Sequence, residues 1–154
     1  MRAVVQRVLE ARVDVGGCSV GVISRGLLVL VCAMAGDDAD DEGWLVDKLL
    51  ALRVFADDAG KMNRALHEVP GAGLLVVSQF TLAADLSPGR SKGNRPSFMA
   101  AMPPAAAAAA FERVVAALGR SGLPVAAGVF GADMQVHLIN DGPVTLWLDS
   151  KGPV

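Results

Sequence analysis

Two short segments of the sequence carry polar side chains where a reaction could take place. The first is SQFTL at 78–82, which follows an apolar run typical of a buried strand. Polar residues at the end of such a strand, ahead of a long loop, are well placed for a binding site. They also suit a strand end without function, because hydroxyl side chains there satisfy local backbone groups. The residue types alone leave both interpretations open.

The second segment is NDGPVT at 140–145. By itself it indicates a tight turn that joins two strands. Its glycine has no side chain, so the carbonyl of Gly142 can approach a ligand closely. The bond before Pro143 has a prior of about 5–6% for the cis form in folded proteins. The segment is therefore either an ordinary hairpin turn or a main-chain element of a site.

Common catalytic signatures are absent: the sequence has no glycine-rich phosphate loop, no HExxH and no nucleophile elbow. Of the two histidines, His67 lies in a polar segment and His137 alternates with apolar residues on a predicted strand. The spacing of Cys18 and Cys32 matches no zinc or redox motif, and Cys32 is expected in the core. The acidic run at 37–42 is expected to begin a helix, with a metal site as the minor alternative. We predict no metal and no cofactor.

The elements that must position these segments follow from the apolar periodicity. A glycine-, serine- and proline-rich loop is expected at 85–97. Helices are expected at 44–53 and 103–118, the second opening on two prolines. Strands are expected at 2–8, 11–15, 20–23, 26–33, 74–79, 125–130, 134–139 and 144–148. The pattern predicts an α/β fold with a mixed sheet and two main helices, in one domain over residues 1–154.

The composition limits the possible classes of protein. With 53% apolar and 19% charged residues, the chain can bury a core without disulfides, and a second copy is expected to cover part of its surface. A net charge of −2 argues against a broad nucleic-acid surface, although Arg90, Lys92 and Arg95 form a local basic loop. The longest apolar run, at 27–35, is about half of the ~20 residues that a membrane span requires. No targeting segment is apparent, so we expect a cytoplasmic protein.

SQFTL at 78–82 and NDGPVT at 140–145 resemble the two signature motifs of the D-aminoacyl-tRNA deacylase family. Neither signature departs from the family pattern, and the resemblance spans nearly the whole chain. It implies a three-layer β/β/α domain that works as a homodimer, with active sites at the subunit interface. Further segments that look like the family, in family order, are QRV at 6–8, GLLVLV at 26–31, GKMN at 60–63, NRPSF at 94–98 and ADMQV at 132–136.

The resemblance implies a hydrolase that cleaves the ester between a D-amino acid and the 3′-terminal adenosine of tRNA, a proofreading step of translation. Gly142 and Pro143 would form a cis element that enters the partner's pocket, with Arg7 and Asn140 in support. Their rigid carbonyls would grip the α-amino group and leave no volume for an L side chain, so glycine should not be fully excluded. The residues that would line the pocket are Ser78, Gln79, Phe80 and Thr81.

The tRNA body is expected to contact the basic loop through its phosphates. Phe98 would contact the adenine, or else anchor the loop as a buried residue. The expected partners are tRNA charged with D-amino acids or glycine and a second copy of the chain, with no membrane and no DNA. The residues assigned to tRNA are Arg90, Lys92, Arg95 and Phe98.

Two routes for the chemistry remain open. Thr81 could act as the nucleophile, but it needs a base that the signature does not supply. We prefer assistance from the ribose 2′-OH, with backbone N–H groups near Phe80 and Thr81 as an oxyanion hole. Two rivals are a Ser/Thr hydrolase that uses Ser78 or Thr81 with His137, and a non-catalytic tRNA-binding dimer.

Overall fold

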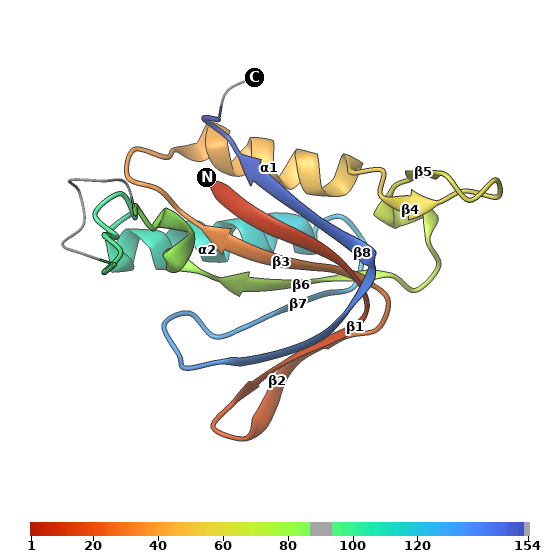
Figure 1. Cartoon of the computed structure of the whole chain (residues 1–154), viewed down its shortest axis with the longest axis horizontal. Coiled ribbons are helices and arrows are strands. Elements are labelled where there is room, and N and C mark those ends of the chain that lie inside the picture. The colour runs from red at the N-terminus through yellow and green to blue at the C-terminus, as the bar shows by residue number, and fades with distance from the viewer. Residues whose placement is uncertain (87–93, 153–154) are drawn as a thin grey trace.

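A computed structural model of the chain describes residues 1–86 and 94–152 (Figure 1). β1 pairs antiparallel with β2 and β3 along one edge and with β8 along the other, whereas β3, β6 and β7 run parallel. This mixed sheet is the one that the sequence predicts. Its strands are β1 (Arg2–Val15), β2 (Cys18–Ile23), β3 (Gly26–Cys32), β6 (Gly73–Ser78), β7 (Val125–Ala127) and β8 (Gln135–Asp149).

The long strands β1 and β8 each belong to two layers, because both bend sharply (Figure 1). One apolar cluster, which includes Leu27 and Leu74, lies between the sheet and the helices. A second cluster, which includes Leu28, Leu75 and Val13, lies between the two β layers. Successive residues of β3 and β6 thus enter different clusters, as expected for strands buried on both faces. The β/β/α arrangement implied by the resemblance is confirmed.

Two helices, α1 (Ala39–Ala51) and α2 (Pro104–Gly119), cover one face of the sheet (Figure 1). α2 agrees with its prediction to within one residue at each end. α1 begins at residue 39 rather than at 44, because the acidic run forms its first turn. The Asp38 side chain accepts hydrogen bonds from the backbone N–H groups of Asp40 and Asp41, and the Asp41 carboxylate accepts one from that of Asp38. The acids therefore cap the helix, where the macrodipole favours negative charge.

The buried carboxylate of Asp41 also ties α1 to the end of β8. Burial alone would raise the pKa of this carboxyl. Hydrogen bonds from Ser150, from the Asp38 backbone and from Lys151 outweigh burial and lower the pKa of Asp41 to about 2. The carboxylate is therefore charged over the whole physiological range of pH.

The remaining elements are short. β4 (Phe55–Ala56) and β5 (Met62–Arg64) form a hairpin, closed by a hydrogen bond from the Gly60 N–H to the Asp57 carbonyl. Two 3₁₀ helices, η1 (Leu66–Glu68) and η2 (Phe80–Ala83), occur in the part of the chain that the structure describes. Among the described residues, none of the helices is long and apolar enough to cross a membrane.

Two expectations for the strands are wrong. The sequence predicts a break between strands at 2–8 and 11–15, but β1 runs unbroken through this stretch. It also predicts a hairpin turn at 140–143, but β8 continues in one direction along β1 on both sides of that segment. The turn residues form a local excursion instead, since the ladder on either side holds the chain to the same neighbour. β7 also ends at Ala127, three residues short of the predicted 130.

Candidate active site

A cleft of about 620 Å³ opens at the carboxyl end of β6. Its walls come from the end of β6, the segment before α2, the first turns of α2 and the segment that leads into β8. Most of its lining is apolar, which is typical of small-molecule sites. The lining residues are Val77, Ser78, Gln79, Phe80, Phe98, Met99, Ala101, Met102, Pro103, Pro104, Ala107, Phe130, Gly131, Ala132, Met134 and Val136.

The position of the first signature follows from the way in which β6 ends. The Gln79 N–H donates to the Val31 carbonyl at 2.7 Å, which extends the pairing with β3 by one residue. The chain then turns into η2, held by a hydrogen bond from the Leu82 N–H to the Gln79 carbonyl. The first N–H groups of such a helix have no partner within it. The N–H groups of Phe80 and Thr81 occupy these positions.

The side chains of the signature do not all face the cleft. Ser78, Gln79 and Phe80 line it, whereas Thr81 is exposed and is not among the lining residues. The Thr81 hydroxyl accepts a hydrogen bond from the side-chain amide of Gln79. The Phe80 ring, 59% exposed, meets Phe98 edge to face with ring centroids 5.0 Å apart. An aromatic pair thus stands at the rim of the cleft.

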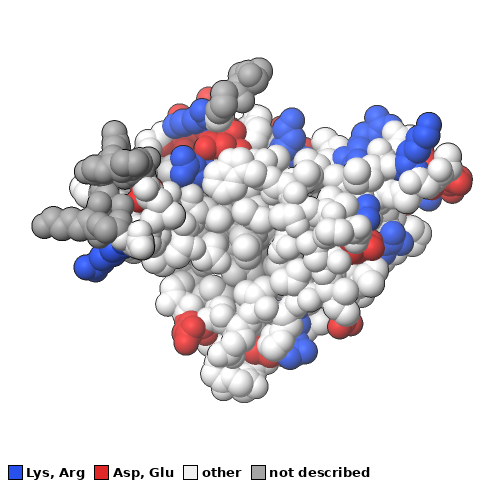
Figure 2. All heavy atoms as spheres, viewed as in Figure 1, with Lys and Arg blue, Asp and Glu red and all other residues white. Residues whose placement is uncertain are grey.

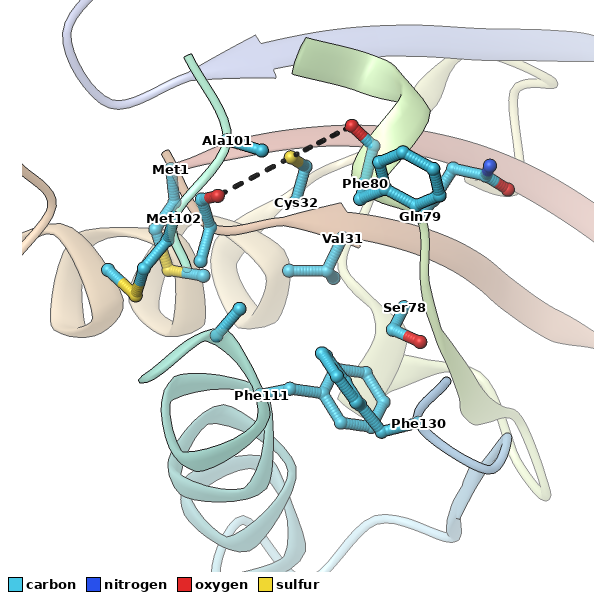
Figure 3. A pocket seen from close by; sticks show the side chains of 12 residues that line it. Met1, Val31, Cys32, Ser78, Gln79, Phe80, Ala101, Met102, Phe111 and Phe130 are labelled. Carbon is cyan, nitrogen blue, oxygen red and sulfur yellow. Dashed lines mark hydrogen bonds between the residues drawn. The ribbon is translucent and has the colours of Figure 1, made fainter. Parts of the chain in front are cut away.

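A smaller hollow of about 30 Å³ shares part of its lining with the cleft (Figure 3). The thiol of Cys32 lies within hydrogen-bonding distance of the Phe80 carbonyl, at 3.6 Å, and burial raises the pKa of this thiol. Cys32 is buried, as the sequence predicts. The neutral thiol thus contacts the main chain at the start of η2.

The second signature forms an excursion of β8 out of its ladder with β1. Gln6 pairs with Thr145 and Val8 pairs with Asn140, so β1 advances two residues while β8 advances five. The Asn140 side chain closes the excursion: its Nδ2 donates to Thr145 Oγ1 at 2.8 Å, and its Oδ1 accepts from the Val144 N–H at 3.3 Å. The peptide bond between Gly142 and Pro143 is cis, and Gly142 has a φ of +118°.

Arg7 lies on β1 opposite this excursion and contacts it directly. Its Nη1 donates to the carbonyl of Val54. Its Nε forms an ion pair with Asp141 Oδ2 at 3.0 Å, without the alignment of a hydrogen bond. A Cβ atom added to Gly142 would lie 2.7 Å from Arg7 Nη2, so the guanidinium packs on this glycine. Asp141 is a residue of this site that the sequence does not single out.

Within one chain the two signatures lie apart. Asn140 of β8 pairs with Val8 of β1, Val8 pairs with Gly26 of β3, and Gly26 pairs with Gly73 of β6. Asn140 is therefore level with Gly73 across the sheet. The other end of the excursion, Thr145, aligns with Leu75 in the same way. Ser78 is therefore three to five residues farther along β6, which at roughly 3.3 Å per residue is about 10–16 Å. Gly142 and Pro143 are exposed, and none of the cleft-lining residues comes from the excursion. The candidate residues therefore form two groups, one at the carboxyl end of β6 and one near the middle of β8.

The remaining candidates are divided between different places. Phe98 lines the cleft, and Arg95 is exposed close to it in sequence. Arg90 and Lys92 lie outside the described residues. Sequence reasoning missed the apolar wall made by Phe130 and Met134, which stand at the facing ends of the strands predicted at 125–130 and 134–139.

His137 does not face the cleft. Its neighbour Val136 lines the cleft, and successive residues of a strand point to opposite faces. His137 Nε2 instead lies 3.2 Å from Asp14 Oδ2, and Asp14 also pairs with Arg12. These contacts lie on β1 and β8, and they hold the imidazole away from Ser78.

Comparison with known proteins identifies close relatives. The model of the family described as D-Tyr-tRNA(Tyr) deacylase matches residues 4–149. Proteins named D-aminoacyl-tRNA deacylase from Anaeromyxobacter dehalogenans and Geobacter sulfurreducens are 57% and 52% identical to this chain. Each match covers 98% of this chain, and 98% and 96% of the respective relative.

Two solved structures resemble the fold. A structure described as c-Myc DNA Unwinding Element Binding Protein has a TM-score of 0.85 at 39% identity, with all of both chains covered. A probable eukaryotic D-amino acid tRNA deacylase has a TM-score of 0.77, covering 96% of this chain and 97% of its own. At 18% identity the second likeness concerns the fold alone.

Proposed function

Because the chain belongs to the D-Tyr-tRNA(Tyr) deacylase family, we propose that it hydrolyses the ester between a D-amino acid and the 3′ end of tRNA. The observation that carries this proposal is the cleft at the end of β6, which has the size and apolar lining of a ligand site and includes the first signature. Relatives that are more than half identical over nearly their whole length carry the same activity in their names.

The experiment compares purified chain on D-tyrosyl-tRNA and L-tyrosyl-tRNA at matched concentrations, with and without a chelator. We expect release of D-tyrosine only, unchanged by the chelator. A variant with the cleft filled, Ala132→Trp, serves as the matched control and should lose this activity. Binding of tRNA without turnover by the unchanged chain would favour a non-catalytic module instead.

The separation of the two signatures supports a homodimer in which each excursion enters the partner's cleft. A segment about 10–16 Å along the sheet from Ser78 cannot line the cleft of its own chain without leaving the sheet. Among the described strands, β8 is paired along one edge only. The face that carries β8 and β1 is broadly uncharged (Figure 2), with Trp147 and Ile139 about half exposed. Sedimentation at micromolar concentration should give twice the mass of the chain, and a monomer would refute this proposal.

Rejection of the L configuration is assigned to the main-chain carbonyls of Gly142 and Pro143. Carbonyls held by the sheet on both sides of the excursion move less than a side chain, whose rotamers interchange. They would bind the α-amino group and occupy the volume of an L side chain. Glycine has no side chain to collide, so glycyl-tRNA should be hydrolysed at a measurable rate. Complete inertness toward glycyl-tRNA would count against a steric filter.

The chemistry is proposed to depend on the ribose 2′-OH of the substrate. The Thr81 hydroxyl accepts its hydrogen bond from an amide, which is not a base. The 2′-OH would orient water beside the ester, and the N–H groups that open η2 would face the developing oxyanion. Thr81→Ala should retain most activity, while tRNA that ends in 2′-deoxyadenosine should lose it. The opposite pattern would favour Thr81 as the nucleophile.

The body of the tRNA is proposed to contact Arg95, together with Arg90 and Lys92, through its phosphates. Phe98, which lines the cleft beside Phe80, is proposed to contact the adenine. Replacing Arg95 with glutamine should raise KM uniformly for all tRNAs and flatten its salt dependence. We propose that this work, translational proofreading, takes place in the cytoplasm, where charged tRNA is used.

A further inference from the structure

The guanidinium of Arg7 has a separate neighbour for each of its three nitrogens. Nη1 donates to the Val54 carbonyl, Nε pairs with Asp141, and Nη2 packs on Gly142. We propose that Asp141 is a positioning residue for the selection of configuration, because it orients Arg7 against Gly142. This inference rests on the proposed function of the excursion.

The excursion is held to the sheet at both of its ends. Its two ends are fixed by ladder pairs at Asn140 and Thr145, and the residues between them leave the ladder. Asn140 closes the base of the excursion through neutral hydrogen bonds to Thr145 and Val144. Asp141, the residue directly before Gly142, instead forms an ion pair with Arg7. This pair joins the excursion to β1.

The environment of the pair makes this connection effective. The side chains of Arg7 and Asp141 are only 12% and 26% exposed, so solvent screens their attraction less than at an open surface. The hydrogen bond to Val54 holds one nitrogen of Arg7 but leaves the guanidinium free to turn about that contact. The Asp141 carboxylate removes this freedom. It sets the orientation of the guanidinium plane that contacts Gly142. The direction of the Gly142 and Pro143 carbonyls depends on this orientation.

Loss of the carboxylate should therefore act on selection rather than on cleavage. The cleft residues remain unchanged, whereas the carbonyls that grip the α-amino group lose their fixed position. We expect a higher KM for D-tyrosyl-tRNA with nearly unchanged kcat, and faster cleavage of L-tyrosyl-tRNA.

The test compares Asp141→Asn with Asp149→Asn. Arg2 and Asp149 also form an ion pair between β1 and β8, at 3.0 Å from Nε to Oδ2, and this pair is aligned as a hydrogen bond. Asp149→Asn therefore controls for the loss of an arginine–aspartate contact across these strands away from the excursion. The ratio of kcat/KM for D- and L-tyrosyl-tRNA should fall roughly fivefold in Asp141→Asn, the order expected for a partly buried pair, and stay unchanged in the control. Asp141→Glu should recover part of the ratio.

A double variant separates positioning from a local structural effect. In an Arg7→Gln background, Asp141→Asn should change the ratio little further, since both act through one guanidinium. Full additivity, or a change no larger than that of Asp149→Asn, would overturn the inference while leaving the proposed function intact. Equal hydrolysis of both substrates by the unchanged chain would overturn the proposed function itself, and this inference with it.

Discussion

Replacing Gly142 with alanine adds a single carbon atom, Cβ, to the excursion. The φ of +118° lies where a residue with a side chain costs on the order of 1–3 kcal/mol. The added Cβ would also lie 2.7 Å from Arg7 Nη2 and 3.0 Å from Val144 Cγ2. Both distances are shorter than an ordinary van der Waals contact. Displacing the guanidinium weakens its ion pair by about 1 kcal/mol. The sum is a loss of about 2–4 kcal/mol in the free energy of unfolding.

Gly122→Ala measures how much a side chain at a positive φ alone lowers the free energy of unfolding. Gly122 has a φ of +80°, and nothing lies within 4 Å of the position of its Cβ. Urea unfolding of both variants at one protein concentration should show Gly142→Ala to be the less stable by about 1 kcal/mol. The same samples, assayed on D- and L-tyrosyl-tRNA, should show lower stereoselectivity in Gly142→Ala alone. Equal stability and equal selectivity of the two variants would refute the packing of Arg7 on Gly142 as the basis of selection.

Three further predictions follow from single contacts. His137→Ala should leave kcat/KM for D-tyrosyl-tRNA within about twofold of the unchanged chain, because the imidazole pairs with Asp14 away from the cleft; a loss of about a hundredfold would revive the Ser/Thr hydrolase. Gly26→Ala should destabilise the fold by more than about 3 kcal/mol in urea unfolding, since its Cβ would lie 1.9 Å from the backbone oxygen of Gly73; a loss below about 1 kcal/mol would contradict this packing. Asp41 has a lowered pKa, so its contribution to stability is complete above the unfolded value near 4 and is lost as pH falls through about 2. Asp41→Asn should therefore be less stable than the unchanged chain at pH 7 and approach it at pH 2, and an equal gap at both pH values would argue against this role.

The central strands and the first signature could be predicted because their causes are local. β3 and β6 are apolar at successive positions, which indicates burial on both faces wherever they pair. The strand end at Ser78 is marked by the change from valine to polar residues, and it opens into the cleft. α2 could be placed to within a residue because proline and glycine mark its two ends.

The second signature could not be understood from its own residues. Asparagine, aspartate, glycine and proline favour a turn locally, and a turn that reverses the chain is the simplest outcome. The outcome in this fold depends on β1, more than 130 residues earlier in the sequence, whose ladder holds β8 on both sides of the excursion. The contact between Arg7 and Asp141 has the same long range. Periodicity carries no signal for such a pair.

One subunit's excursion is proposed to work in the other subunit's cleft. Mixed dimers of Gly142→Ala chains and Ala132→Trp chains test this directly. An equal mixture, refolded together, should give a ratio of kcat/KM for D- over L-tyrosyl-tRNA above that of Gly142→Ala alone, because half of the dimers would hold one intact site of two. A ratio equal to that of Gly142→Ala alone would contradict the cross-subunit site.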